Sequence, residues 1–178
     1  MIKYFAYGDK MFSPQLRSIV SSVRVIGVAK IAGYKLFFHS RGIEDPSGKC
    51  NILPVKDIAS EVFGVLYEIP MQDRYLLDKA EGLGNYNQEV RLKVYPFYHN
   101  TDIEQAEGIA AFTYIAHKDN IFEDLVPFTW YKEMVICGAR EHHVPMEYIH
   151  HLEQYAAAID PNVHRATKQT RYLESSVL

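Results

Sequence analysis

The chain has 178 residues and a formal net charge of −3, and hydrophobic residues make up 48% of it. This length and apolar content are typical of one globular domain and exclude a chain that is disordered as a whole. With 19 basic residues against 22 acidic ones, it lacks the surplus of positive charge on which nucleic-acid binding rests. Its uncharged stretches are shorter than the about 20 residues of a membrane helix. We therefore expect neither nucleic acid nor a membrane as a partner.

The cysteines and the first residues predict a cytoplasmic protein. Cys50 and Cys137 lie far apart, and a chain of this size does not need a disulfide to fold. The first residues already belong to a predicted strand and do not show the basic region, apolar stretch and cleavage site of a secretory signal, so we expect none. Reduced thiols in the cytoplasm are the simplest interpretation.

Strands are predicted where apolar residues run continuously or alternate with polar ones. In chain order they cover residues 2–8, 23–38 (two strands or one kinked strand), 50–55, 61–69, 89–95 and 108–116. Helices are predicted over residues 71–81, 131–140 and 145–158, and polar loops over 41–49 and 100–107. Because the strands come early and the longer helices late, we expect the α+β class, with a sheet that closes toward a barrel and helices packed outside it.

The first candidate site follows the first strand, in the segment Tyr7, Gly8, Asp9, Lys10 and Met11. A glycine after a buried strand lets the backbone turn sharply and brings N–H groups close to a ligand. Such loop amides can hold a carboxylate or an oxyanion. A plain strand-ending turn is the other interpretation.

The second candidate is Glu81, in the last turn of a predicted helix and just before Gly82 and Gly84. A carboxylate there meets the negative end of the helix dipole, which disfavours its charged form. If the side chain is also buried, its pKa rises toward the range of a general acid or base. A surface glutamate at a helix end is the alternative.

Histidines form a third cluster, in which His143, Glu147 and His151 have a spacing of four residues. Pro145 is expected to begin the helix, however, which leaves His143 in the preceding loop. Nothing else in the sequence completes a ligand set, so we predict no native metal site.

Taken in order, several segments resemble the γ-glutamylcyclotransferase family. The family opens with an aromatic strand and a Tyr-Gly-Ser-Asn loop, and it later carries a Gly-Val strand and a Leu-Asp-x-x-Glu-Gly helix end followed by a tyrosine. The matching segments here are residues 4–11, 64–67, 77–82 with Tyr86, 131–141 and 144–148. The resemblance covers about residues 3–160, so we expect one γ-glutamylcyclotransferase-like domain over residues 1–160 and a C-terminal tail over 161–178.

The resemblance implies a small mixed β-barrel of about six or seven strands with flanking helices and one cleft. It also implies an enzyme that releases 5-oxoproline and a free amine or amino acid from a γ-glutamyl compound, without a metal or an organic cofactor. By this analogy Glu81 is the catalytic acid/base. The residues implied to bind substrate are Tyr7, Gly8, Asp9, Lys10, Met11, Tyr86, Tyr114 and Tyr131.

One position departs from the family pattern, because Asp9 and Lys10 stand where the family has Ser-Asn. The departure leaves three hypotheses besides a γ-glutamyl amino acid as substrate. The substrate is a γ-glutamylamine, or it is a carrier-bound γ-glutamyl group, or the chain is a non-catalytic small-molecule-binding module on the same scaffold. The sequence leaves the oligomeric state open.

Overall fold

The computed structural model describes residues 1–98 and 107–177. Within these residues five strands close a barrel in the order β1-β5-β2-β6-β7, and β3 and β4 form a separate two-stranded sheet. The strands are β1 (Ile2–Ala6), β2 (Arg24–Ala32), β3 (Tyr34–Arg41), β4 (Gly48–Pro54), β5 (Glu61–Ile69), β6 (Asn87–Pro96) and β7 (Ile109–Ala116).

The first strand explains why the barrel is mixed. The side chains of Tyr4 and Phe5 are buried, as the continuous apolar run predicted. β1 pairs with β5 in the antiparallel sense and with β7 in the parallel sense, where Tyr4 lies opposite Phe112. The prediction of an α+β fold with a mixed barrel is therefore confirmed, although two of the seven described strands stand outside the barrel.

A glycine separates those two strands from the barrel. Gly33 has a φ of +73°, a left-handed conformation that favours glycine, and it ends β2 before β3 begins. The backbone of Gly33 donates to the carbonyl of Ser60 and accepts from the amide of Val55. The apolar stretch over residues 23–38 thus forms two strands in two different sheets.

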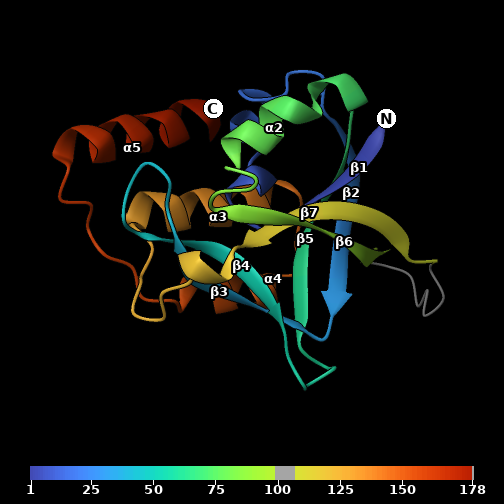
Figure 1. The fold of residues 1–178 in the computed structure, drawn as a ribbon. Coiled ribbons are helices and arrows are strands. Elements are labelled where there is room, and N and C mark those ends of the chain that lie inside the picture. The colour runs from blue at the N-terminus through green and yellow to red at the C-terminus, as the bar shows by residue number, and fades with distance from the viewer. Residues whose placement is uncertain (99–106, 178) are drawn as a thin grey trace.

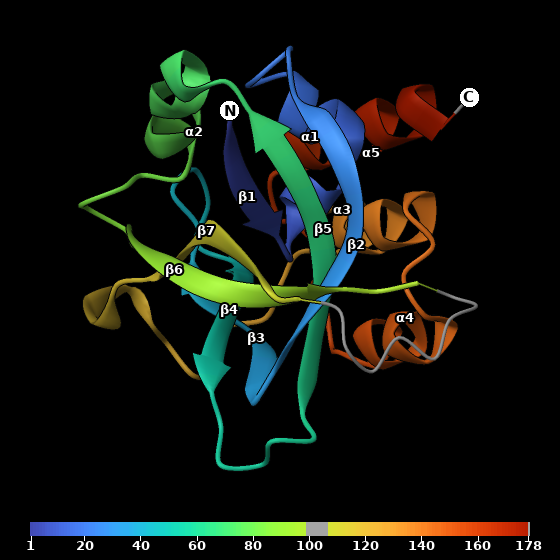
Figure 2. The ribbon, with the colours of Figure 1, turned by 90° about the vertical axis from the view of Figure 1, so that its right-hand side faces the viewer.

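Five α-helices lie in the described part of the chain, and Figures 1 and 2 show them outside the barrel. Helix α3 packs closely on the turn that follows β1, since a Cβ on Gly138 would lie 2.3 Å from the backbone nitrogen of Phe12. No helix among the described residues is long and apolar enough to cross a membrane. The helices are α1 (Ser13–Arg17), α2 (Arg74–Ala80), α3 (Thr129–Glu141), α4 (Met146–Glu153) and α5 (Val163–Val177).

The structure differs from the predicted elements near the C-terminus. Helix α4 ends at Glu153 because the chain then extends and Ala158 exchanges hydrogen bonds with the backbone beside Phe128. Residues 161–178, expected only as a tail, contain α5, which lies at the same end of the molecule as α2 (Figure 1). The predicted loop at 100–107 falls almost entirely outside the described residues.

Candidate active site

A cavity of about 560 Å³ opens where β1 ends, between the C-terminal end of α2, the β3–β4 loop, α3 and α5. Most of the site residues predicted from the sequence line it, namely Tyr7, Gly8, Asp9, Lys10, Glu81, Tyr86, Tyr114 and Tyr131. Met11 does not: its side chain is fully buried in the core. The chain thus brings the predicted loop, the predicted glutamate and three predicted tyrosines to one cavity.

Gly8 lets the loop after β1 pass close to its neighbours. A Cβ at this position would lie 3.0 Å from the Cβ of Cys50 and 3.4 Å from the hydroxyl of Tyr131. A short 3-10 turn over Asp9–Met11 follows. The amides of Asp9 and Lys10 begin this turn and so have no acceptor within it. The turn itself therefore leaves these two amides unused, and both residues line the cavity.

The end of helix α2 fixes the position of Glu81. Its amide donates to the carbonyl of Leu77, and its carbonyl accepts from the side-chain amide of Asn87 at 2.8 Å. Gly82 follows with a φ of +63°, as expected for a glycine that ends a helix. The backbone on both sides of Glu81 is thus held in place.

Two carboxylates and one ammonium meet beside this helix end. The Nζ of Lys10 lies 2.7 Å from Oδ2 of Asp9 and 3.5 Å from Oε1 of Glu81. Burial raises the pKa of Glu81; the ammonium of Lys10 opposes this rise, and the charge of Asp9 adds to it. The pKa of Lys10 is raised as well, because the two carboxylates outweigh its burial. Lys10 thus stays an ammonium, while Glu81 takes up a proton more readily than an ordinary glutamate.

Two tyrosines of the cavity wall, Tyr131 and Tyr114, donate hydrogen bonds to nearby carboxylates. The hydroxyl of Tyr131 donates to Oδ1 of Asp9 at 3.4 Å and accepts from the amide of Cys50 at 3.2 Å. Tyr114 donates to Oδ1 of Asp78, and burial raises its pKa. These hydroxyls are therefore neutral hydrogen-bonding groups near neutral pH.

Sequence reasoning missed a second charged group in the cavity, centred on Lys49. Its Nζ donates to both carboxylate oxygens of Asp45 and to the hydroxyl of Ser47, and it lies 4.9 Å and 4.5 Å from the ring centres of Trp130 and Tyr131. It also missed Gln169 of α5, which lines the cavity. Asp45, Ser47 and Lys49 are close in the sequence, but they reach the rings of α3 and the cavity wall that includes Gln169 only through the packing of distant segments. In the described residues no cluster of three or more His, Cys, Asp or Glu side chains is placed to hold a metal ion.

Comparison with known proteins identifies the family. The model of the AIG2-like family matches residues 61–152, which is more than half of the chain. This chain belongs to the AIG2-like family. The gamma-glutamylcyclotransferase of Homo sapiens is 26% identical over 163 residues, covering 89% of this chain and 79% of the human protein. The protein of the same name from Bos taurus is 26% identical over 167 residues, with the same coverage. The predicted family resemblance is therefore confirmed.

The fold agrees with this assignment. A solved structure of a gamma-glutamyl cyclotransferase superposes with a TM-score of 0.75, covering 94% of this chain and 98% of the other at 21% identity. At this identity the likeness concerns the fold, and the chemistry of the cavity has to be argued from its own side chains.

Proposed function

We propose that this AIG2-like protein is an enzyme of the γ-glutamylcyclotransferase type, which releases 5-oxoproline from a γ-glutamyl compound with Glu81 as general acid and base. The observation that carries the proposal is the position of the Glu81 carboxyl. It is only 17% exposed, lines the cavity and lies 3.5 Å from an ammonium group. Its raised pKa favours proton exchange closer to neutral pH than an ordinary glutamate allows.

In the proposed reaction the substrate amine faces Glu81. The carboxylate takes a proton from the α-ammonium, and the freed amine attacks the γ-carbonyl carbon of the same molecule. A new carbon–nitrogen bond closes the five-membered ring, and protonated Glu81 gives its proton to the leaving nitrogen as the bond to that nitrogen breaks. Glu81 then takes the second proton from the ring nitrogen and passes it to the released amine, which leaves as an ammonium. The protons balance, so the step needs no cofactor, and because the attack is intramolecular the cavity has only to fold the chain of the substrate.

The loop after β1 supports the same step. Charge develops on the carbonyl oxygen during the attack, and donors already aimed at that position stabilise it. The amides of Asp9 and Lys10, which have no acceptor within their own turn, are the donors that we assign to this role.

The test is the release of 5-oxoproline by purified protein. The panel contains γ-glutamyl amino acids, γ-glutamyl-lysine and glutathione, so that it includes leaving groups of several kinds. We expect at least one member to give 5-oxoproline and its free amine in equal amounts. Absence of product from every member contradicts the proposal. Ligand-induced stabilisation without turnover would instead favour the binding-module hypothesis.

A further inference from the structure

The cavity holds a cation with unused hydrogen-bonding capacity. We propose that the side chain of Lys10 binds the α-carboxylate of the substrate, and thus that it selects substrates with an intact α-amino-acid head group. This inference rests on the proposed function, because it takes a γ-glutamyl group as the ligand. It assigns to one side chain a role that the loop amides do not fill.

The first argument is the number of donors on Lys10. An ammonium group has three N–H donors. Among the described residues its recorded partners are Oδ2 of Asp9 at 2.7 Å and Oε1 of Glu81 at 3.5 Å. At least one donor is therefore left without an acceptor, on a side chain that lines the cavity and is only 12% exposed. A buried cation with a free donor facing a cavity is well suited to an anionic group of a ligand.

Lys49, the second buried lysine of this cavity, shows the contrast. Its three donors are used by Oδ1 and Oδ2 of Asp45 and by the hydroxyl of Ser47, at 2.9, 2.8 and 2.7 Å. It has no donor left for a ligand. Of these two lysines only Lys10 can take up a further anion without giving up a partner.

The second argument concerns charge. A γ-glutamyl head group carries an ammonium and a carboxylate on the same carbon. When its ammonium faces Glu81, it replaces Lys10 as the positive neighbour of that carboxylate. Lys10 keeps Asp9 and turns its free donor to the ligand carboxylate. Each charge of the head group then lies beside one of opposite sign, and the net charge of the site does not change.

The third argument identifies which carboxylate is bound. Lys10 and Glu81 are neighbours, with 3.5 Å between Nζ and Oε1, so the groups they bind must also be neighbours on the ligand. The α-amine and the α-carboxylate share one carbon atom. A carboxylate on the leaving amino acid is separated from the amine by the γ-amide bond, so no shared atom keeps it beside the amine.

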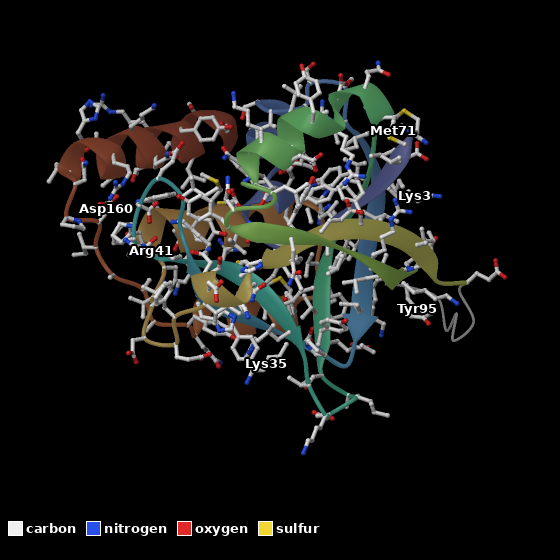
Figure 3. The ribbon with its side chains drawn as sticks, in the orientation of Figure 1. Lys3, Lys35, Arg41, Met71, Tyr95 and Asp160 are labelled. Carbon is white, nitrogen blue, oxygen red and sulfur yellow. The ribbon has the colours of Figure 1, made fainter. Side chains whose placement is uncertain are left out.

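The test compares ligands that differ by one carboxylate. 5-Oxoproline carries the carboxylate, and 2-pyrrolidinone is the same ring without it. We expect Lys10→Met to weaken the binding of 5-oxoproline by about 10- to 100-fold, the range for a charged hydrogen bond, and to leave the binding of 2-pyrrolidinone unchanged. Lys10→Arg retains the charge and should restore part of the affinity. Lys35→Met is the matched control, since Lys35 is an exposed residue of β3 and does not line the cavity (Figure 3).

Two further substrates show whether Lys10 binds the α-carboxylate or the carboxylate of the leaving group. γ-Glutamyl-ethylamine has only the α-carboxylate, and 4-aminobutanoyl-alanine has only the carboxylate of the leaving group. The proposal predicts that Lys10→Met raises KM for the former and not for the latter. The opposite pattern would show that Lys10 binds the leaving group, and would overturn the proposal.

The remaining outcomes are also decisive. The proposal is contradicted if Lys10→Met weakens the binding of 5-oxoproline and of 2-pyrrolidinone equally. It is also contradicted if the wild-type protein does not bind 5-oxoproline. If Lys10→Met does not fold, the double variant Asp9→Asn/Lys10→Met removes both charges of the pair and is compared with Asp9→Asn alone. Lys10-dependent binding of 5-oxoproline without turnover of any γ-glutamyl compound would refute the proposed function and the role of Lys10 in substrate selection, and would leave only its binding of the carboxylate.

Discussion

Two carboxylates of this protein have pKa values shifted in opposite directions: half-buried Glu81 in the cavity, and buried Asp160 just before helix α5. Asp160 accepts hydrogen bonds from the indole of Trp130, the amide of Asn162 and the guanidinium of Arg165, all between 2.7 and 2.9 Å. These donors, Arg165 first, lower its pKa to about 2 although burial opposes the change. The pKa of Glu81 is raised, since its burial is offset only by one ammonium at 3.5 Å.

The two carboxylates differ in which cause dominates: burial comes first at Glu81, whereas hydrogen bonds from charged and polar donors, Arg165 first, outweigh burial at Asp160. The Asp160 side chain is 0% exposed and that of Glu81 is 17% exposed. A carboxylate whose oxygens are fully hydrogen-bonded stabilises the fold. Asp160 does so because it binds Trp130 of α3 and Arg165 of α5. A carboxylate with few donors can still exchange a proton and bind a ligand.

The largest effect on activity is expected from substitution of Glu81, the carboxylate of the two that lines the cavity. Glu81→Gln keeps the shape of the side chain and removes its ability to carry a proton, so we expect 5-oxoproline formation to fall by about 10²- to 10⁴-fold. The variant should fold normally, because Lys10 retains Asp9 as a partner. Turnover numbers and melting temperatures of the two proteins check both statements.

A matched control is Glu61→Gln, in which a glutamate paired with Lys30 on the outside of the barrel is changed in the same way. We expect it to retain wild-type turnover. Wild-type activity in Glu81→Gln would remove Glu81 from the reaction.

The second prediction concerns stability. Asp160→Asn removes the charge that Arg165 and Trp130 bind, and weakening these hydrogen bonds should lower the free energy of unfolding by about 1–3 kcal/mol. We expect faster amide exchange in α5, measured by hydrogen–deuterium exchange. Exchange rates in α5 equal to those of the wild type would show that this ion pair does not anchor the helix.

The stability difference between the wild type and Asp160→Asn should also depend on pH. The pKa of Asp160 is lower in the folded protein, about 2, than the about 3.9 of an unfolded aspartate. Its stabilising effect is therefore complete above about pH 4 and is lost as the pH falls toward 2. The difference in stability between wild type and Asp160→Asn should shrink over that interval.

The smallest expected effect concerns Cys50, whose thiol lines the cavity beside Gly8. Burial raises its pKa well above the usual range, so it stays a thiol near neutral pH. We expect slow alkylation of Cys50 by iodoacetamide and nearly full turnover in Cys50→Ala. A loss on the order of 10⁶-fold, as on removal of a nucleophile, would point to covalent chemistry at this sulfur instead.

The sequence predicts the part of the site that depends on local structure. The turn at Gly8 follows from a buried strand that ends in glycine, and the position of Glu81 follows from a helix that ends at Gly82. Met11 shows the limit of this reasoning. The segment after Gly8 forms a 3-10 turn in which the amide of Met11 bonds to the carbonyl of Gly8, and its side chain lies in the core instead of the cavity.

Features that depend on contacts between distant segments were not predictable from one sequence. Asp160 accepts a hydrogen bond from Trp130, thirty positions earlier in the chain, in addition to those from Arg165, which is the first cause of its lowered pKa. Lys49 and Asp45 meet the rings of α3 only once the β3–β4 loop lies over that helix. Residues 161–178 are polar, so α5 could be foreseen only from the surface against which Leu173 packs.

The most direct test of the central claim is the pH dependence of kcat/KM for 5-oxoproline formation. The reaction needs Glu81 as a carboxylate, so activity should rise with pH through a pKa above the about 4.3 of an ordinary glutamate. Removing the ammonium in Lys10→Met destabilises the carboxylate and should move this acidic limb to still higher pH. An acidic limb at or below the ordinary value, unchanged in Lys10→Met, would contradict the account.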